Sequence, residues 1–331
     1  MQNTIRVIQY GLGPIGRAVA RHVMERAGLE LVGAVDVDPA KAGRDLGEVI
    51  GLDRLLGKTV VAELGALLAT QPADLVLHTT SSYFDLFKSQ ILEILNSGLD
   101  IVSTAEELSF PWLAHADDAR EVDAAAKRAG KTVLATGVNP GFLMDALPLS
   151  LTALCQKVEH IAVTRVIDAS KRRGPFQAKI GAGMTAEAFH SKMEAGRMGH
   201  VGLPESMGMI FHTLGKELAR YESRVEPLLA KTKIQTDYFE VPAGQVQGLK
   251  QTAHGFTPEG EFVTLTFIAA LEVDREGDTV VIKGKPDLEV HLSGTNGDLA
   301  TVAMVVNAVR RVRDAAPGLV TMRDLPIVTW W

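Results

Sequence analysis

Three glycines follow the first apolar run of the chain at a spacing that few folds use. Residues 6–10 (Arg-Val-Ile-Gln-Tyr) form an expected short strand, Gly11, Gly13 and Gly16 come directly after it, and a helical pattern covers residues 17–27. The first glycine permits a tight turn, the second lets a phosphate approach the backbone, and the third lets the helix lie close to the strand. This segment predicts a dinucleotide-binding turn with the pyrophosphate at the helix N-terminus.

An acidic residue closes the next expected strand, residues 30–35. Asp36 follows that strand, 20 residues beyond the last glycine of the turn. A carboxylate there accepts hydrogen bonds from the adenosine ribose 2′-OH, which favours NAD. Asp36 and Asp38 would repel a 2′-phosphate, whereas Lys41 and Arg44 are close enough in sequence to offset that repulsion. We therefore expect NAD as the cofactor, with NADP possible.

The first half of the chain alternates short apolar strands with helical segments, which is typical of parallel βαβ units with helices on both faces of a sheet. This pattern predicts an α/β fold with a Rossmann doubly wound parallel sheet. The further expected strands are residues 59–61, 73–78, 100–103 and 131–135, and the helices between them are residues 62–69, 86–96 and 116–129.

The rhythm changes near residues 139–141, Asn-Pro-Gly. We expect a helix over residues 142–154, with Pro148 as a possible kink, and then strands over residues 159–165, 262–273 and 279–282. The last two are separated by a charged turn containing Gly277, which suggests a mostly antiparallel sheet in a second α+β domain. A long helix from residue 298 to 316 contains no Gly or Pro and is expected to pack back on the first domain. The predicted domains are residues 1–140 with 298–331, which bind NAD(P), and residues 141–297, for substrate and dimerisation.

Length and composition limit the class of protein. A chain of 331 residues suggests two domains of ~100–200 residues each. A net charge of −6 leaves no basic surplus for a phosphate backbone, so nucleic acid is not an expected partner. No apolar run reaches the ~20 residues that span a bilayer, and the N-terminus lacks the apolar region of a signal peptide, so we expect a cytoplasmic protein without a membrane partner.

Cysteine and histidine usage points away from metal chemistry. Cys155, the only cysteine, cannot form an internal disulfide or a cysteine-rich zinc site, and an apolar packing role is expected. The spacing of His190, His200, His212 and His254 fits no common ligand motif, so no metal is expected.

Three polar segments are expected at the carboxyl ends of strands, where open α/β sheets bind ligands. Residues 79–82 (Thr-Thr-Ser-Ser) could form a second wall of the cofactor site or an ordinary polar loop. In residues 103–108, a partly desolvated Glu106 or Glu107 beside a nicotinamide could exchange protons near neutral pH. The alternative is that both acids only favour a helix N-terminus. Residues 136–141 could form part of the site or a turn between domains.

Several blocks of the chain resemble the 2,4-diaminopentanoate dehydrogenase and native amine dehydrogenase family, which belongs to the wider dihydrodipicolinate-reductase-like enzymes. The resemblance covers nearly the whole chain, and the last three blocks are the most specific because a generic Rossmann enzyme would not share them. The blocks are residues 11–16, 33–41, 43–48, 103–108, 135–142 with Asp145, 172–181, 199–206 and 297–303.

This resemblance implies reversible NAD(P)-dependent reductive amination of a ketone or aldehyde by ammonia, in a homodimer built through the sheet of the second domain. It implies a glutamate after the fifth Rossmann strand as the acid/base, which corresponds to Glu106, with Glu107 as second choice. The family often has Cys where this chain has Ala105. The residues expected at the cofactor are Gly11, Leu12, Gly13, Pro14, Ile15, Gly16, Asp36, Thr79, Thr80, Ser81, Asn139 and Pro140. Those expected at the substrate are Phe142, Arg172, Phe176, Gln177 and His200.

Substrate identity and two other functions remain open at this point. A diamino acid would need a carboxylate anchor such as Arg165, Arg172, Arg173 or Lys179, whereas an alkyl ketone would need an apolar pocket. A related imine or oxo-acid reductase would act without ammonia, although the His-His-x-x-Lys-x-Asp-type segment usual in dihydrodipicolinate reductases is absent. A non-catalytic NAD(P)-binding sensor would show no turnover with any amine.

Overall fold

The computed structural model describes residues 4–196 and 198–331, which divide into two compact units. Unit 1 runs to Phe142 and resumes from Asn296 to Trp331, and unit 2 is Leu143–Thr295. These boundaries lie within two residues of those expected from the sequence. The C-terminal helix therefore belongs to the same unit as the glycine turn.

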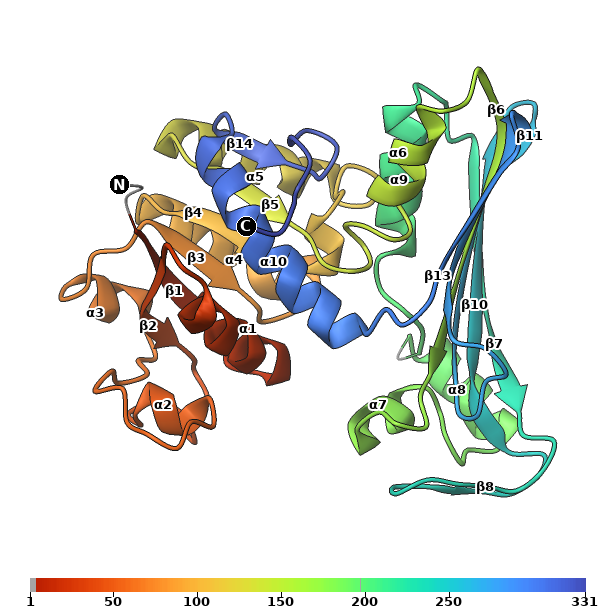
Figure 1. Ribbon diagram of the computed structural model, residues 1–331, viewed down its shortest axis with the longest axis horizontal. Helices are drawn as coiled ribbons and strands as arrows, with labels where there is room; N and C mark the ends of the chain where they lie inside the picture. The colour runs from red at the N-terminus through yellow and green to blue at the C-terminus, as the bar shows by residue number, and fades with distance from the viewer. Residues whose placement is uncertain (1–3, 197) are drawn as a thin grey trace. The chain divides into compact units, whose positions relative to one another are not determined.

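Unit 1 is built on a six-stranded sheet in which every strand pair is parallel (Figure 1). Parallel strands need crossover connections, and helices supply most of them here. This confirms the expected Rossmann-type sheet. Its strands, in spatial order, are β14 (Gly318–Val320), β5 (Thr132–Ala135), β4 (Asp100–Ser103), β3 (Leu75–His78), β1 (Ile5–Tyr10) and β2 (Leu29–Val35).

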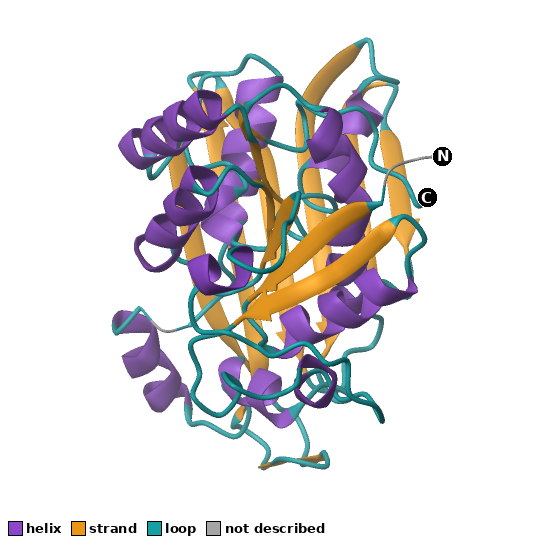
Figure 2. Cartoon of the chain, turned by 90° about the vertical axis from the view of Figure 1, so that its left-hand side faces the viewer, coloured by secondary structure: helices purple, strands orange, loops and turns teal. Residues whose placement is uncertain are grey.

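Two pairs of long helices cover the two faces of this sheet. Helices α1 (Pro14–Glu25) and α10 (Gly297–Asp314) pack on each other, as do α4 (Phe84–Asn96) and α5 (Ala116–Ala129). Alternate strand residues such as Ile8 and Val76 join one apolar core with α4 and α5, so their neighbours in sequence face α1 and α10. Figure 2 shows helices on both sides of the strands. The short helices of this unit are α2 (Leu46–Val49), α3 (Leu64–Leu68) and the 3-10 helix η1 (Glu106–Leu108).

Two expected elements of this region are wrong. Residues 59–61 form no strand, because only the isolated bridges Asp45–Thr59 and Val35–Val61 hold them. The sixth strand is instead β14, which the sequence did not predict because it has only three residues. The expected helix over residues 142–154 is shortened to α6 (Ala146–Thr152), which begins where the Asp145 carboxylate accepts a hydrogen bond from the Ala146 N–H. Pro148 lies in the first turn, where its missing N–H has no intrahelical acceptor, so it need not kink the helix.

Unit 2 contains a second six-stranded sheet, which is mostly antiparallel as expected. The exception is the parallel pair β6–β11. The antiparallel neighbours expected on either side of Gly277 are also not adjacent. The two strands that flank Gly277 do not form a hairpin, because β6 lies between them. The spatial order is β13 (Leu288–Leu292), β12 (Gly277–Lys285), β6 (Lys157–Asp168), β11 (Gly260–Ala270), β10 (Val246–Thr257) and β7 (Arg220–Leu229).

The two faces of this second sheet differ in burial. Ile161 and Val163 of β6 are buried in an apolar core with residues of α9 (Leu203–Thr213). The intervening residues Ala162, Thr164 and Val166 are only partly buried. The remaining elements of unit 2 are α7 (Gly174–Lys179), α8 (Ala186–Glu194), and the small hairpin of β8 (Ile234–Gln235) and β9 (Glu240–Val241).

Candidate functional site

Five polar or glycine-rich segments meet at one edge of the unit 1 sheet. The glycine turn follows β1, Asp36 follows β2, Thr79 follows β3, Glu106 follows β4 and Asn139 follows β5. Because all these strands are parallel and adjacent, their carboxyl ends lie along the same edge. This is the edge at which open α/β sheets bind their ligands.

The glycine turn after β1 has the geometry that its spacing predicts. Gly11 has a φ of 90°, and a Cβ there would lie 2.7 Å from the carbonyl oxygen of Thr79. A Cβ on Gly16 would collide with the Gly11 carbonyl oxygen, so α1 could not pack this closely against the turn with any other residue. Only glycine therefore fits either position without a shift of the backbone.

The glycine turn of residues 11–16 and the N-terminus of α1, together called the dinucleotide cradle below, leave room for a pyrophosphate at Gly13. This residue is the N-cap of α1, no side chain caps the helix there, and a Cβ on it would meet nothing within 4 Å. Pro14 occupies the first helical position and is exposed, while Leu12 is fully buried. Ile15 is half-buried. The first N–H groups of α1 can therefore hydrogen-bond to a phosphate above Gly13.

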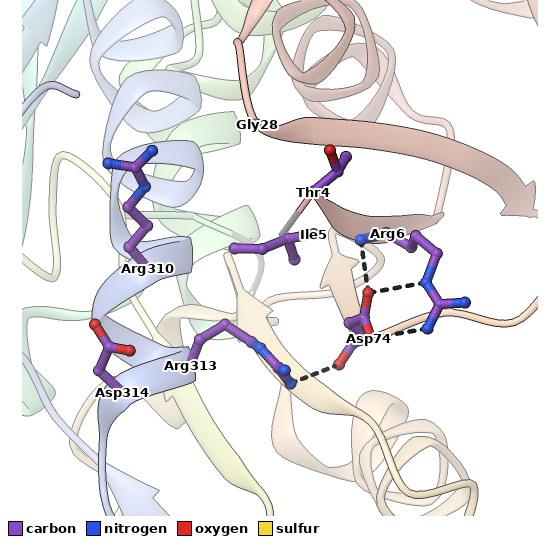
Figure 3. A pocket seen from close by; sticks show the side chains of 8 residues that line it. All are labelled: Thr4, Ile5, Arg6, Gly28, Asp74, Arg310, Arg313 and Asp314. Carbon is purple, nitrogen blue, oxygen red and sulfur yellow. Dashed lines mark hydrogen bonds and ion pairs between the residues drawn. The ribbon is translucent and has the colours of Figure 1, made fainter. Parts of the chain in front are cut away.

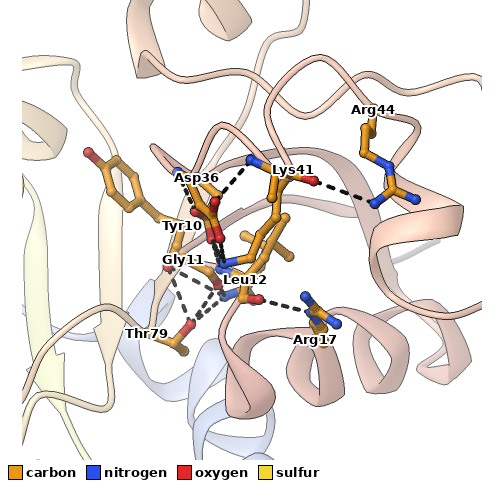
Figure 4. Close-up of polar contacts among 11 residues, drawn as sticks. Tyr10, Gly11, Leu12, Arg17, Asp36, Lys41, Arg44 and Thr79 are labelled. Atoms are coloured by element: carbon orange, nitrogen blue, oxygen red, sulfur yellow. Dashed lines mark hydrogen bonds and ion pairs between the residues drawn. The ribbon is translucent and has the colours of Figure 1, made fainter.

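Asp36 joins the glycine turn to the loop after β2 (Figure 4). Its Oδ2 accepts hydrogen bonds from the Leu12 N–H at 2.6 Å and from Lys41 Nζ at 3.0 Å, and its Oδ1 accepts one from the Asp38 N–H at 2.9 Å. Lys41 Nζ also lies 3.2 Å from Asp38 Oδ2. The carboxylate expected at the ribose is thus held in place by backbone N–H groups and neutralised by a lysine.

The loop after β3 approaches the glycine turn through Thr79. Thr79 Oγ1 donates to the Gly11 carbonyl oxygen at 2.9 Å and accepts from Gln9 Nε2 at 2.8 Å. Thr80 is exposed and Ser81 is half-buried, with Ser81 Oγ accepting a hydrogen bond from the Tyr83 N–H. These contacts place the loop beside the glycine turn.

Adjacent glutamates follow β4 in different surroundings. Glu107 Oε2 accepts a hydrogen bond from the Phe84 N–H at 2.6 Å, at the start of α4, and lies 3.3 Å from His115 Nε2. The Glu107 N–H also donates to the Ser82 carbonyl oxygen at 3.2 Å. Glu107 therefore ties η1 to the loop after β3 and to the N-terminus of α4. Glu106 is half-buried at the start of η1, where its carbonyl oxygen accepts hydrogen bonds from the Ser109 N–H at 3.1 Å and from Ser109 Oγ at 2.7 Å.

The turn after β5 is largely buried. Asn139 is 9% exposed, and a cis peptide bond joins it to Pro140. Gly141 has a φ of 121°, and a Cβ there would lie 2.6 Å from the Gly137 nitrogen. Thr301 of α10 supports the turn by accepting a hydrogen bond from the Val138 N–H at 3.2 Å.

The expected substrate residues fall in both units. Phe142 is half-buried at the end of the first part of unit 1. In unit 2, the Arg172 guanidinium lies 4.7 Å from the centre of the Phe176 ring. Gln177 is fully buried, with Nε2 donating to the carbonyl oxygens of Ser170 and Arg172. Its Oε1 accepts from Thr236 Oγ1 at 2.8 Å, so its amide hydrogen-bonds within unit 2 and supports the Arg172 loop.

His200 stands in a cationic part of unit 2. The His200 ring stacks on Phe267 with centroids 4.6 Å apart, and the backbone N–H of His200 donates to Gln251 Oε1 at 2.7 Å. Removal from water, followed by the charges of Lys179 and Arg165, lowers the pKa of His200 to about 3. Arg165 itself is 2% exposed and pairs with Asp278 at 2.9 Å, so it already has a buried counterion.

Comparisons with known proteins agree with the resemblance noted in the sequence. Residues 142–331 match the family model described as the 2,4-diaminopentanoate dehydrogenase C-terminal domain. The chain is 31% identical over 332 residues to the 2,4-diaminopentanoate dehydrogenase of Acetoanaerobium sticklandii, covering 98% of this chain and 94% of that relative. The chain belongs to the 2,4-diaminopentanoate dehydrogenase family.

Two amine dehydrogenases are also similar to this family member. The amine dehydrogenase of Streptomyces virginiae is 26% identical over 354 residues, covering 98% of this chain and 96% of the relative. The structure of the amine dehydrogenase from Mycobacterium smegmatis superimposes with a TM-score of 0.87 at 22% identity, covering 99% of this chain and 97% of that one. The solved structure thus shares the fold of the whole chain.

The expectation that Glu106 follows the fifth strand of the Rossmann sheet is wrong by one strand. Because residues 59–61 are not a strand, the segment that carries Glu106 follows the fourth strand in the chain order of unit 1, not the fifth. Sequence analysis included Ser103 in a candidate polar segment but gave no role to Ser103 or to His78, both fully buried at strand ends. A buried polar residue at the last position of an apolar strand was the available signal.

A cavity of about 550 Å³ lies at the opposite edge of the unit 1 sheet, at the amino ends of the strands (Figure 3). Arg6 pairs with Asp74 at 3.0 Å, and Arg313 pairs with Asp100 at 2.6 Å, so these arginines hold the beginnings of the strands to one another and to α10.

Across residues 4–196 and 198–331, no three His, Cys, Asp or Glu side chains are grouped to hold a metal ion. In the same residues, no helix is long and apolar enough to cross a membrane.

Proposed function

We propose that this family member is an NAD(P)-dependent amine dehydrogenase that reductively aminates a ketone or aldehyde with ammonia, and oxidatively deaminates the amine in reverse. One observation carries the proposal. Glu106 follows β4 and lies at the same sheet edge as the dinucleotide cradle. Membership of the dehydrogenase family and the dinucleotide cradle support the same reaction class.

Glu106 is the proposed acid/base. Its carboxylate removes a proton from ammonium, so that neutral ammonia attacks the carbonyl carbon of the substrate. It then returns a proton to the carbinolamine hydroxyl, which leaves as water and forms an iminium ion. The nicotinamide, when bound, supplies the hydride that reduces this carbon. Asn139 and Pro140, buried after β5, are proposed to form the wall against which the nicotinamide ring lies.

The matched pair Glu106→Gln and Glu107→Gln tests the acid/base assignment. We expect Glu106→Gln to lose activity on the order of a hundredfold or more, because a carboxamide cannot exchange the proton. Its dissociation constant for NADH should change little. Glu107→Gln can still accept the Phe84 N–H through its amide oxygen and should retain most turnover. Near-normal turnover in Glu106→Gln, or a loss confined to Glu107→Gln, would move the role elsewhere.

A ketone and aldehyde panel tests the reaction itself. Oxidation of NADH and NADPH is followed with and without ammonia, over substrates that carry or lack a carboxylate. Ammonia-dependent turnover supports the proposal, and turnover without ammonia would instead indicate an imine or oxo-acid reductase of the same fold. A chain that binds NADH but turns over no substrate in either direction would be a sensor.

We propose NAD as the preferred cofactor, with NADP accepted. Asp36 is held by the Leu12 and Asp38 N–H groups in a position to accept hydrogen bonds from the ribose hydroxyls. Lys41 supplies the positive charge that a 2′-phosphate would require.

We also propose a homodimer formed through the sheet of unit 2. The face that carries Ala162, Val166 and Ile268 is only partly buried, although β6 and β11 are central strands. Burying such a face against a second copy removes apolar area from water. Light scattering should give twice the monomer mass, and Ala162→Glu should shift it toward monomer. A monomeric wild type would refute this assembly.

A further inference from the structure

A fully buried histidine lies beneath the proposed acid/base, at the last position of β3. His78 has no exposed surface, and its ring packs near Tyr10 and Phe87. Both ring nitrogens have polar partners. Nδ1 lies 2.9 Å from Ser103 Oγ at the end of β4, and Nε2 lies 2.8 Å from Gln90 Oε1 on α4.

The orientation of the Gln90 amide, with Oε1 toward His78, sets the direction of the hydrogen bonds at the two ring nitrogens. Gln90 Oε1 can only accept, and it also accepts from Thr80 Oγ1 at 2.7 Å, so His78 Nε2 must carry the proton. In a neutral imidazole, Nδ1 is then an acceptor, and the Ser103 hydroxyl donates to it. The Ser103 oxygen in turn accepts the Ala105 N–H at 3.0 Å. A neutral ring is also what burial favours, because removal from water lowers the pKa of His78 to about 4.

The hydrogen-bond network runs from the segment that carries Glu106 to the loop after β3. At one end, the N–H of Ala105 is the backbone group directly before Glu106. At the other, Thr80 Oγ1 lies 2.9 Å from His78 Nε2, in the loop after β3 that contacts the glycine turn. The β3–β4 pairing places His78 opposite Ser103, so the ring connects these ends across adjacent strands.

We propose that His78 is a positioning residue, which acts through Ser103 and Thr80 to fix the Glu106 segment relative to the cofactor loop. This inference rests on the proposed function of Glu106. The imidazole touches neither substrate nor cofactor in this role. His78 holds the backbone at Ala105 in the position from which the Glu106 carboxylate reaches the substrate nitrogen. A displacement of about 1 Å in a catalytic carboxylate can cost ~100-fold in rate.

Four variants separate positioning from simple packing. Ser103→Ala removes the link from His78 to Ala105, and His78→Phe keeps a ring but removes both polar contacts. His78→Gln restores one acceptor and one donor. Thr132→Val is the matched control, because Thr132 is 2% exposed at the opposite end of neighbouring β5. Each variant is characterised by circular dichroism, NADH titration by fluorescence, and kcat and KM in ammonia-dependent turnover from pH 6 to 10.

We expect Ser103→Ala and His78→Phe to lower kcat by about tenfold to a hundredfold and to shift its pH profile, because a displaced Glu106 would exchange its proton in different surroundings. The NADH dissociation constant of Ser103→Ala should stay within about threefold of wild type, since the glycine turn is untouched. His78→Gln should recover most of the turnover lost in His78→Phe. Thr132→Val should keep the wild-type kcat and pH profile.

A wild-type kcat and pH profile in Ser103→Ala would overturn the inference, as would an equal loss in Thr132→Val. If His78→Phe does not fold, Ser103→Ala and His78→Gln still decide. Long-range ¹⁵N–¹H NMR adds a readout without turnover, because it identifies the tautomer directly. An Nδ1–H tautomer at His78, assigned from its loss in His78→Gln, would overturn the network. Failure of the proposed function looks different: wild-type enzyme that binds NADH without ammonia-dependent turnover would remove both proposals.

Discussion

Lys41 Nζ lies 3.0 Å from Asp36 Oδ2, so the carboxylate expected at the adenosine ribose is paired with a cation five residues along the same loop. The lysine side chain is 17% exposed and the aspartate 9%, which shields the pair from solvent more than a surface ion pair. A ribose with free hydroxyls can use Asp36, and a ribose phosphate can use Lys41. This pairing is the physical basis for expecting both cofactors.

Removal of Lys41 should narrow the cofactor range. In Lys41→Ala, a 2′-phosphate would face Asp36 and Asp38 without a counter-charge, so the KM for NADPH should rise about tenfold or more. The KM for NADH should change much less. Lys127→Ala is the control, because Lys127 is an exposed lysine that pairs with Asp123 within α5. Steady-state kinetics with both cofactors provide the test, and improved use of NADPH by Lys41→Ala would contradict it.

Two alanine substitutions in the glycine turn should behave differently. A Cβ at Gly13 meets no protein atom within 4 Å, so Gly13→Ala should fold normally, but it narrows the space above the helix N-terminus. We expect its affinity for NADH to fall at least about tenfold while its free energy of unfolding changes by less than about 1 kcal/mol. Gly16→Ala should destabilise the protein by about 1–3 kcal/mol, because its Cβ collides with the Gly11 carbonyl oxygen.

Calorimetric titration with NADH and urea unfolding measure these two effects. Weakened binding by Gly16→Ala together with normal binding by Gly13→Ala would mean that the pyrophosphate does not lie above Gly13.

Buried His78 should make stability depend on pH over a defined range. Its pKa is lowered to about 4 in the folded protein, against an ordinary 6.5. Between these values the unfolded chain binds a proton that the folded protein does not, so the free energy of unfolding falls as the pH drops from 6.5 to 4. Such a difference amounts to roughly 3 kcal/mol, and below pH 4 this group contributes no further loss.

Urea unfolding of wild type and His78→Gln from pH 7 to 4 measures this contribution. The variant should show a shallower decline over that range. Parallel curves for the two proteins would show that His78 is protonated in the folded state or has an ordinary pKa.

The buried pair Arg165–Asp278 should be sensitive to the loss of either partner. Arg165→Met leaves the Asp278 carboxylate, 2% exposed, without its cation, which should cost about 3–5 kcal/mol. The double variant Arg165→Met/Asp278→Leu should recover most of this loss. Lys157→Met is the control, because its exposed pair with Glu159 is worth at most about 1 kcal/mol. A double variant as unstable as the single one would show that the pair itself contributes net stability.

Local patterns predicted most of unit 1. Strand β4 and helix α5 coincide with their expected ranges, because a buried parallel strand and a bounded helix each leave a continuous signal in neighbouring residues. The errors have a common cause. Residues 59–61 are apolar like a strand, but the edge of β2 accepts only an isolated bridge there, and β14 pairs with β5 from nearly 200 residues away. The residues of a strand do not by themselves specify which other strand it pairs with.

The same distinction applies to the candidate site. Gly11, Gly13, Gly16 and Asp36 are separated by at most 25 residues, and their roles follow from backbone conformation and chain direction within one βαβ unit. The sequence by itself therefore determined the dinucleotide cradle, and family resemblance added the reaction class. It left Glu106 and Glu107 as first and second choices, because adjacent carboxylates have the same chemistry.

The tertiary structure places the two glutamates in different surroundings. Glu107 accepts the N–H of Phe84 and pairs with His115, while the backbone before Glu106 is connected through Ser103 to His78. These partners come from other strands and helices, and only the order of β3 and β4 in the sheet brings them within hydrogen-bond distance. Hydrogen bonds act over about 3 Å, so the surroundings of each carboxylate depend on packing that no local pattern specifies.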